Sequence, residues 1–156
     1  MKHNFNCMVD VQARAKFARL IRHLVAGLIT NDEFEDRLPF SEDSAVHEVY
    51  FNGVWGLYSD LYKYRLVGKN RVPREARRII ARYILFLKSD LEYEWPKQSR
   101  WQFPVSFVAA LLTLGMSNRW HFKKFSKAGD IKVWPFIRQS DFEAALRRPP
   151  YLHGRN

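Results

Sequence analysis

The sequence predicts a mainly α-helical protein, a compact bundle of about five to six helices that ends in a small C-terminal β-hairpin. Apolar residues recur at every third or fourth position along most of residues 11–116, as on one face of a helix. With 156 residues, 47% of them hydrophobic, the chain has enough apolar material for one core. We therefore expect a single domain, residues 1–156, with a helical core over 11–116. This core would be followed by a basic aromatic hairpin and a terminal helix over 119–148, and then by a flexible tail over 149–156.

The first two helices are predicted to form a helical hairpin. Residues 11–28 have apolar residues on one side and basic residues on the other, which is typical of an amphipathic helix. Gly27 lies where this helix should end. Thr30, followed three residues later by Glu33, has the pattern of a capping box, which would open a short second helix that ends before Pro39.

Residues 24–38 resemble a known family. They contain Gly27, Ile29-Thr30 and Glu33-Phe34-Glu35, which follow the G-x-I-T-x-x-E-F-E pattern of the SHOCT-type helical hairpin. The match covers about a tenth of the chain, and it departs from the family in its N-terminal position and in Arg37, where the family continues with Lys. The resemblance implies a small interaction or oligomerisation element, with a homo-oligomer among the partners, and it carries no catalytic residues.

Two longer helices are expected in the middle of the chain. The apolar pattern over residues 43–67 is broad and predicts a central helix, in which Gly53 and Gly56 indicate either a close approach to a neighbour or a kink. Pro73 would open the next helix, and Trp95-Pro96 would close it. Its predicted buried stripe consists of Ala76, Ile79, Ile80, Tyr83, Ile84, Leu87 and Leu91.

The C-terminal third begins with an apolar run and then changes its periodicity. Residues 103–116 form an apolar run of 14 residues, too short for the roughly 20 that cross a membrane, and predict a buried helix. Alternation in residues 120–124 and 131–134 predicts two strands around Ala128-Gly129-Asp130. Ser140 would cap a last helix that extends to Leu146.

The charge of the chain indicates an anionic partner. The net charge is +10, and residues 95–156 hold 11 Lys and Arg against 3 Asp and Glu. Residues 63–88 hold nine basic residues against Glu75 alone, whereas residues 32–60 are acidic. We therefore expect oppositely charged faces.

Two groups of residues are candidates for binding a polyanion. Arg74, Arg78 and Arg82 recur every four residues and would form a basic ridge on one helix face, unless they only pair with acids of residues 32–43. The second group interleaves basic and aromatic side chains, which could hold phosphates and stack on bases, or pack on the helices beneath. Its residues are Arg119, Trp120, Lys123, Lys124, Lys127 and Lys132, with Trp134 nearby.

The sequence contains no catalytic motif that we can defend, so we expect a binding module without catalysis. The alternative is a small hydrolase or nuclease that uses Asp43 and His47, or the acids Asp90, Glu92 and Glu94. The five His residues are scattered, and no two have the spacing of paired ligands on a helix, so we expect neither a metal site nor a cofactor.

The single cysteine and the N-terminus bear on location. Cys7 cannot form an internal disulfide, which favours a reducing cytoplasm. No transmembrane segment is expected. Arg14, Lys16, Arg19 and Arg22 would also fit a transit peptide, but the same segment reads as an ordinary domain helix. The expected partner is an anionic macromolecule, either a nucleic acid or an acidic protein surface; the third alternative is an oligomerisation or structural protein.

Overall fold

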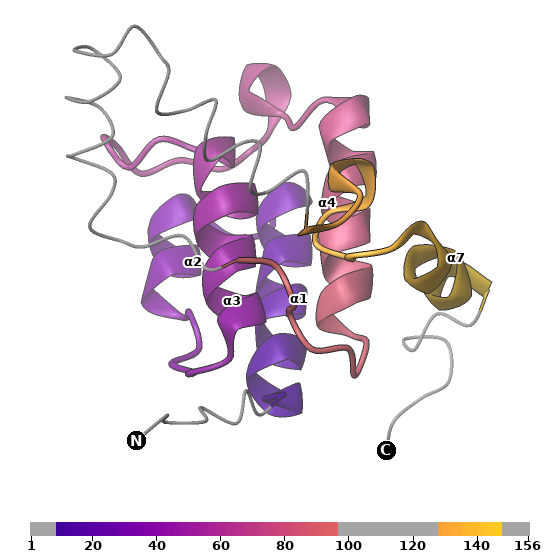
Figure 1. Ribbon diagram of the computed structural model, residues 1–156. Coiled ribbons are helices and arrows are strands. Elements are labelled where there is room, and N and C mark those ends of the chain that lie inside the picture. The colour runs from indigo at the N-terminus through magenta and orange to yellow at the C-terminus, as the bar shows by residue number, and fades with distance from the viewer. Residues whose placement is uncertain (1–8, 97–127, 148–156) are drawn as a thin grey trace, which may run out of the picture.

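The computed structural model describes residues 9–96 and 128–147, and this part of the chain is mainly helical (Figure 1). Its α-helices are α1 (Val11–Val25), α2 (Asn31–Asp36), α3 (Ser44–Val49), α4 (Arg74–Leu87) and α7 (Gln139–Arg147). The described residues form no strand, only an isolated bridge between Thr30 and Arg65. The prediction of a mainly α fold is confirmed. The predicted helix over 103–116, Cys7 and the tail lie outside the described residues.

The helical hairpin at the start of the chain forms as its capping residues predict. Asp10 caps α1 by accepting the backbone N–H of Ala13 at 2.9 Å. Gly27 ends the helix with a φ of 69°, and a Cβ there would lie 2.4 Å from the Val67 Cγ1 atom. At α2, the Thr30 hydroxyl accepts the Glu33 N–H and the Glu33 carboxylate accepts the Thr30 N–H. Both halves of the capping box are therefore present.

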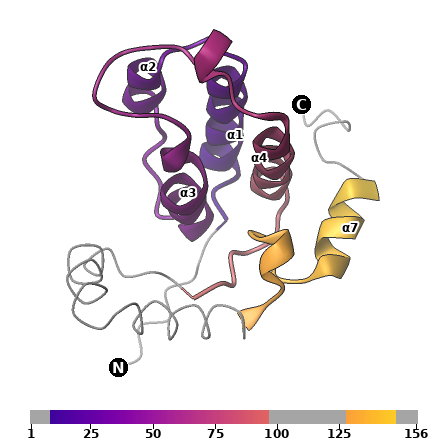
Figure 2. The ribbon, with the colours of Figure 1, turned by 90° about the horizontal axis from the view of Figure 1, so that it is seen from above.

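The core lies between α1, which is central, and the helices on either side of it. Viewed from above, α1 lies between α2 and α4, with α3 beside α2 and α7 on the outer side of α4 (Figure 2). The α1 residues Phe17, Ile21 and Leu24 are fully buried, as are Phe34 of α2 and, to within 1%, Phe86 of α4. Because α1 buries one broad apolar stripe against several partners, its opposite side carries the charged residues.

The predicted helix over residues 43–67 is only partly correct. Helical backbone runs from α3 through a π-helical turn, Tyr50–Val54, and a 3₁₀ turn, Trp55–Leu57, and then stops. Gly53 lies against Tyr83 of α4, so that a Cβ would be 2.6 Å from the ring, whereas nothing lies within 4 Å of a Cβ at Gly56. The close approach expected for these glycines is confirmed at Gly53.

Residues 58–67 are irregular because a buried asparagine binds their backbone. The side-chain amide of Asn31, 2% exposed, donates to the carbonyls of Ser59 at 2.9 Å and Tyr62 at 3.0 Å, and its oxygen accepts the Tyr64 N–H at 2.9 Å. These bonds replace the helical hydrogen bonds that the backbone would otherwise form. A contact from a distant part of the chain thus overrides the local apolar pattern.

The helix predicted to follow Pro73 is present but shorter than expected. Pro73 is the N-cap residue of α4, which ends at Leu87 rather than near Trp95. Two members of the predicted stripe, Ile79 and Leu91, are 42% and 39% exposed. Phe86 is buried instead, because the C-terminal segment covers that side of α4. The Phe136 ring lies edge-on at 5.1 Å from the Phe86 ring.

The predicted C-terminal hairpin is not supported by the described residues. Its second strand is instead a 3₁₀ turn, Ile131–Val133, and its first strand lies outside the described residues. Asp130 caps this turn by accepting the Lys132 N–H at 3.0 Å. The alternation that suggested a strand is not reflected in the burial, because Val133, Trp134, Pro135 and Phe136 are all buried in an irregular segment that lies on α4. The last helix is present, but it begins at Gln139, so Ser140 lies inside it.

A buried ion pair connects α1 to the segments on both sides of it. The Arg14 guanidinium donates from Nε to Asp43 at 2.5 Å and from Nη2 to the other Asp43 oxygen at 3.0 Å, and both side chains are 1% exposed. Arg14 also donates to the carbonyl of Leu91 at 2.7 Å, and Asp43 accepts the N–H of Asp10 at 2.9 Å. The pair therefore joins the start of α1, the start of α3 and the chain after α4.

Among the helices that are described, none is both long and apolar enough to cross a membrane.

Candidate anion-binding site

The predicted basic ridge on α4 divides into two parts with different surroundings. Arg74 and Arg78 are exposed. Arg82 is partly buried, and its guanidinium donates from Nε to the carbonyl of Trp134 at 2.7 Å and from Nη1 to the carbonyl of Lys132 at 2.5 Å. Burial lowers the pKa of Arg82 from its usual value. Arg82 thus attaches the C-terminal segment to α4, and Arg74 and Arg78 are the ridge residues that face solvent.

Of the second predicted group, which interleaves basic and aromatic residues, the structure describes only Lys132. Lys132 is exposed in the 3₁₀ turn after Asp130. Trp134, considered as a surface on which bases could stack, is 7% exposed and packs edge-on against Tyr83 at 5.0 Å. It is therefore a core residue. The other members of the group lie outside the described residues: Arg119, Trp120, Lys123, Lys124 and Lys127.

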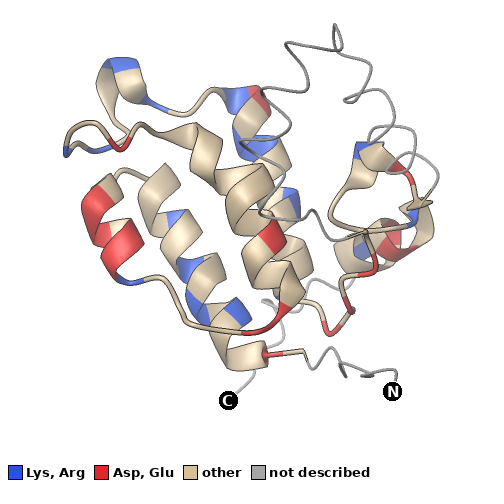
Figure 3. Ribbon diagram, turned by 60° about the vertical axis from the view of Figure 1, so that its left-hand side comes forward, with Lys and Arg blue, Asp and Glu red and all other residues tan. Residues whose placement is uncertain are grey.

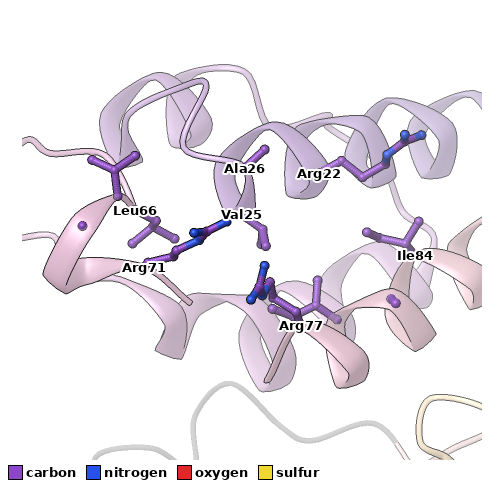
Figure 4. Close-up of a pocket in the computed structure, with 11 residues that line it drawn as sticks. Arg22, Val25, Ala26, Leu66, Arg71, Arg77 and Ile84 are labelled. Atoms are coloured by element: carbon purple, nitrogen blue, oxygen red, sulfur yellow. The ribbon is translucent and has the colours of Figure 1, made fainter. Parts of the chain in front are cut away.

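The structure brings together three arginines that the sequence did not single out as a group. Arg22 of α1, Arg71 from the chain before α4 and Arg77 of α4 line one open pocket of about 600 Å³. We call it the arginine pocket. The head groups of Arg71 and Arg77 turn toward its middle, whereas Arg22 extends along its edge (Figure 4). Three segments far apart in sequence thus place positive charge around one hollow.

The other lining residues of the arginine pocket are mostly apolar. Val25 of α1 and Ile80 and Ile84 of α4 belong to this part of the wall, together with the chain around Leu66. Gly68, which also lines the pocket, has a φ of 56°, so the chain turns sharply there before Arg71. No acidic residue lines the pocket as described. The wall therefore combines an apolar surface with unopposed positive charge.

Charged side chains of one sign predominate on two parts of the described surface. Acidic residues gather on α2, and basic residues occur along α1 and at the start of α4 (Figure 3). The described ion pairs are Arg14 with Asp43, Arg37 with Glu33, and Arg147 with Glu143. None of them joins α4 to an acid of residues 32–43. The alternative that the ridge serves to pair with these acids has no support in the described part of the chain.

Positive charges also lie close together beyond the edge of the pocket. The pKa of Lys88 is lowered, first by burial and then by repulsion from Arg22 and Arg19. Lys88, after α4, therefore lies near the basic side chains of Arg19 and Arg22 on α1.

The residues proposed for catalysis do not form an evident site. Asp43 is buried against Arg14 and accepts the Ala45 N–H at 2.9 Å, whereas His47 is exposed and stacks on the Phe51 ring at 5.8 Å. The acids Asp90, Glu92 and Glu94 are all exposed, and none lines the arginine pocket. Within residues 9–96 and 128–147, no group of three His, Cys, Asp or Glu residues could hold a metal ion.

Only some of the arginines of the arginine pocket could be recognised from the sequence. Arg77 follows Arg74 by three residues and Arg71 precedes the helix, so a basic region around residues 71–78 was visible. Arg22 belongs to another helix, and nothing in the sequence places it beside Arg77. The packing of α1 on α4 makes this connection.

Comparisons with protein-family models, with curated proteins and with solved structures found no match to this chain, so the likeness of residues 24–38 to the SHOCT-type hairpin stays a resemblance.

Proposed function

We propose that this protein is a binding module for an anionic macromolecule, with nucleic acid as the partner to test first. The contact surface would be the basic face, which we define as Arg71, Arg74, Arg77 and Arg78. The observation that carries the proposal is that all four are exposed and that none forms an ion pair with another described residue. Lys132 and the basic residues over 119–127 stay further candidates for contact with the same partner.

Arginine suits this role because of the shape of its head group. The planar guanidinium donates two parallel hydrogen bonds to a phosphate and keeps its charge at any physiological pH. Arg74 and Arg78 are one helical turn apart, so both can point to the same side of α4. Each phosphate that they neutralise would release counterions and make the affinity depend on salt.

The test is binding of fluorescent single- and double-stranded DNA and RNA at two salt concentrations. We expect binding that weakens steeply with salt. Changing Arg74 and Arg78 together to Ala should reduce the slope of log affinity against log salt by about 2 on duplex DNA, since each phosphate contact contributes about 0.9.

The matched control removes two arginines that are already paired. Arg37 and Arg147 each form an ion pair with an acid four residues earlier in the chain, at 3.8 Å and 4.0 Å, so their change to Ala alters the net charge equally. This control should leave most of the binding intact. An equal loss in both double variants would indicate nonspecific adsorption and contradict the proposal. No binding at low salt would exclude nucleic acid and direct the search to an acidic protein surface.

The oligomerisation alternative rests on the apolar side chains at the helical hairpin. Leu28 in its turn is 60% exposed, and Phe40 just beyond it is 97% exposed. Exposed apolar side chains are common on monomers, so these two residues favour the alternative only weakly. Sedimentation velocity over a range of concentrations tests it, with Phe40→Ser as the variant that should dissociate such an oligomer.

The hydrolase or nuclease alternative has no favourable observation among its described residues. Asp43 is occupied by Arg14 and by the start of α3, and a general base must reach the proton that it abstracts.

A further inference from the structure

We propose that the arginine pocket binds one small soluble organic phosphate, whose phosphate group lies between Arg71 and Arg77 and whose apolar body lies on the wall formed by α1 and α4. This inference goes beyond the proposed binding of a macromolecule and does not depend on it. It concerns a small ligand in a hollow that shares Arg71 and Arg77 with the basic face, whereas Arg74 and Arg78 do not line that hollow.

The size of the pocket favours a ligand larger than an inorganic anion. Its volume of about 600 Å³ lies within the range of about 300–1,000 Å³ that is usual for small-molecule sites. A free phosphate would fill a small part of this space and leave the apolar wall in contact with water. A ligand with an apolar body would cover that wall and gain the free energy of removing it from water.

The apolar wall is formed by residues of α1 and α4 together with Leu66 from the chain before α4. Ile80 and Leu66 are 2% and 3% exposed, so they are fixed by the core, and Val25 and Ile84 are partly exposed beside them. Ligand pockets typically combine such an apolar lining with a few polar groups that fix the orientation of the ligand. The arginines of this pocket are those polar groups.

The number of arginines favours a phosphate over a carboxylate. A phosphate monoester carries a charge of about −1.5 to −2 at pH 7 and has three acceptor oxygens. It can therefore accept hydrogen bonds from Arg71 and Arg77 at once and still be attracted by Arg22, whereas a carboxylate has one charge and two oxygens. No described acid competes, because none lines the pocket or pairs with these three residues.

The experiment is isothermal titration calorimetry with 1-naphthyl phosphate, with inorganic phosphate, 1-naphthol and 1-naphthoate as comparison ligands. We expect 1-naphthyl phosphate to bind more tightly than each of the others by on the order of tenfold. Equal affinity for inorganic phosphate would refute a role for the apolar wall. Equal affinity for 1-naphthoate would refute the preference for a phosphate, and no heat with any ligand would refute the site.

Two double variants separate the pocket from the ridge. The double variant with Arg71→Gln and Arg77→Gln should lower the affinity for 1-naphthyl phosphate by at least about tenfold. Arg74→Gln with Arg78→Gln removes the same charge from the same region and should change the affinity by less than about twofold. All four side chains are exposed, so both variants are expected to fold, which circular dichroism checks. Equal weakening by the two variants would contradict the assignment.

The apolar wall and the source of the phosphate have their own tests. Val25→Thr keeps the shape of the side chain but makes it polar. It should lower the affinity for 1-naphthyl phosphate and leave the weak binding of inorganic phosphate unchanged. Vesicles of phosphatidylcholine with and without phosphatidic acid test a membrane source. Binding to the acidic vesicles without binding of the soluble ester would overturn the proposal. If the ester fails to bind but DNA or RNA binding persists, the pocket is refuted and the proposed function stands.

Discussion

Replacing Arg14 by methionine is expected to destabilise the protein more than any other loss of a described arginine. Arg14 is 1% exposed, and its guanidinium donates to both oxygens of Asp43 and to the carbonyls of Ser89 and Leu91. Methionine fills similar space but donates no hydrogen bond. Asp43 would keep the N–H groups of Asp10 and Ala45 as donors, but it would lose its only described cation.

The size of the effect follows from leaving a charge buried without its partner. Removing one member of a buried ion pair costs about 3–5 kcal/mol, against a total stability of about 5–15 kcal/mol for a typical domain. We expect Arg14→Met to lower the free energy of unfolding by an amount in this range. Adding Asp43→Asn should restore part of the loss. The double variant should therefore lose about 2 kcal/mol less free energy of unfolding than the sum of the losses in the two single variants.

The assay is urea unfolding followed by circular dichroism for the wild type, both single variants and the double variant. Arg19→Met is the control, because Arg19 is an exposed arginine of the same helix and should change the stability by less than about 0.5 kcal/mol. A loss below about 1 kcal/mol for Arg14→Met, or strictly additive effects, would refute the assignment of Arg14 and Asp43 as a coupled buried pair.

Three further predictions concern single contacts. Gly53→Ala should destabilise the fold by about 1–3 kcal/mol, because the new Cβ would lie 2.6 Å from the Tyr83 ring, whereas Gly56→Ala has free space and should be close to neutral in urea unfolding. Asn31→Ala should cost about 2 kcal/mol or more in the same assay, because it leaves the carbonyls and N–H of the loop over 58–64 without partners; an unchanged stability would contradict this. The pKa of Asp10 is lowered from 3.8, mainly by the Ala13 N–H, so its stabilising contribution is present above that pH and is lost as the pH falls through the folded value. Unfolding measured from pH 6 to pH 2 should therefore show that Asp10→Asn loses less stability on acidification than the wild type does. A pH profile equal to that of the wild type would exclude this role.

The ends of the first two helices could be read from the sequence because their causes are local. The turn at Gly27 needs a residue that adopts a positive φ, and the capping box of Thr30 and Glu33 connects residues three apart. Such features involve neighbours within one helical turn, so the printed sequence contains all of their parts. The amphipathic patterns of α1 and α4 are local in the same sense.

The elements that were predicted wrongly are those whose backbone is bound by distant residues. The continuous helix over 43–67 ends early because Asn31 binds the backbone of residues 59–64. The predicted second strand of the hairpin is a 3₁₀ turn because Trp134 and Phe136 pack on α4 and Arg82 binds two carbonyls there. Periodicity alone cannot reveal a hydrogen-bond partner that lies tens of residues away.

The sequence by itself determined that the protein is helical, basic and amphipathic, since composition and spacing are properties of the chain. It also marked the region around Arg74 and Arg78 as a basic surface. Only the tertiary structure decided which arginines act together: it buried Arg14 against Asp43, attached Arg82 to the C-terminal segment and placed Arg22 beside Arg71 and Arg77. The physical reason is that the surroundings of a charge depend on which helices pack together, and that packing minimises the exposed apolar area of the whole chain rather than of any one segment.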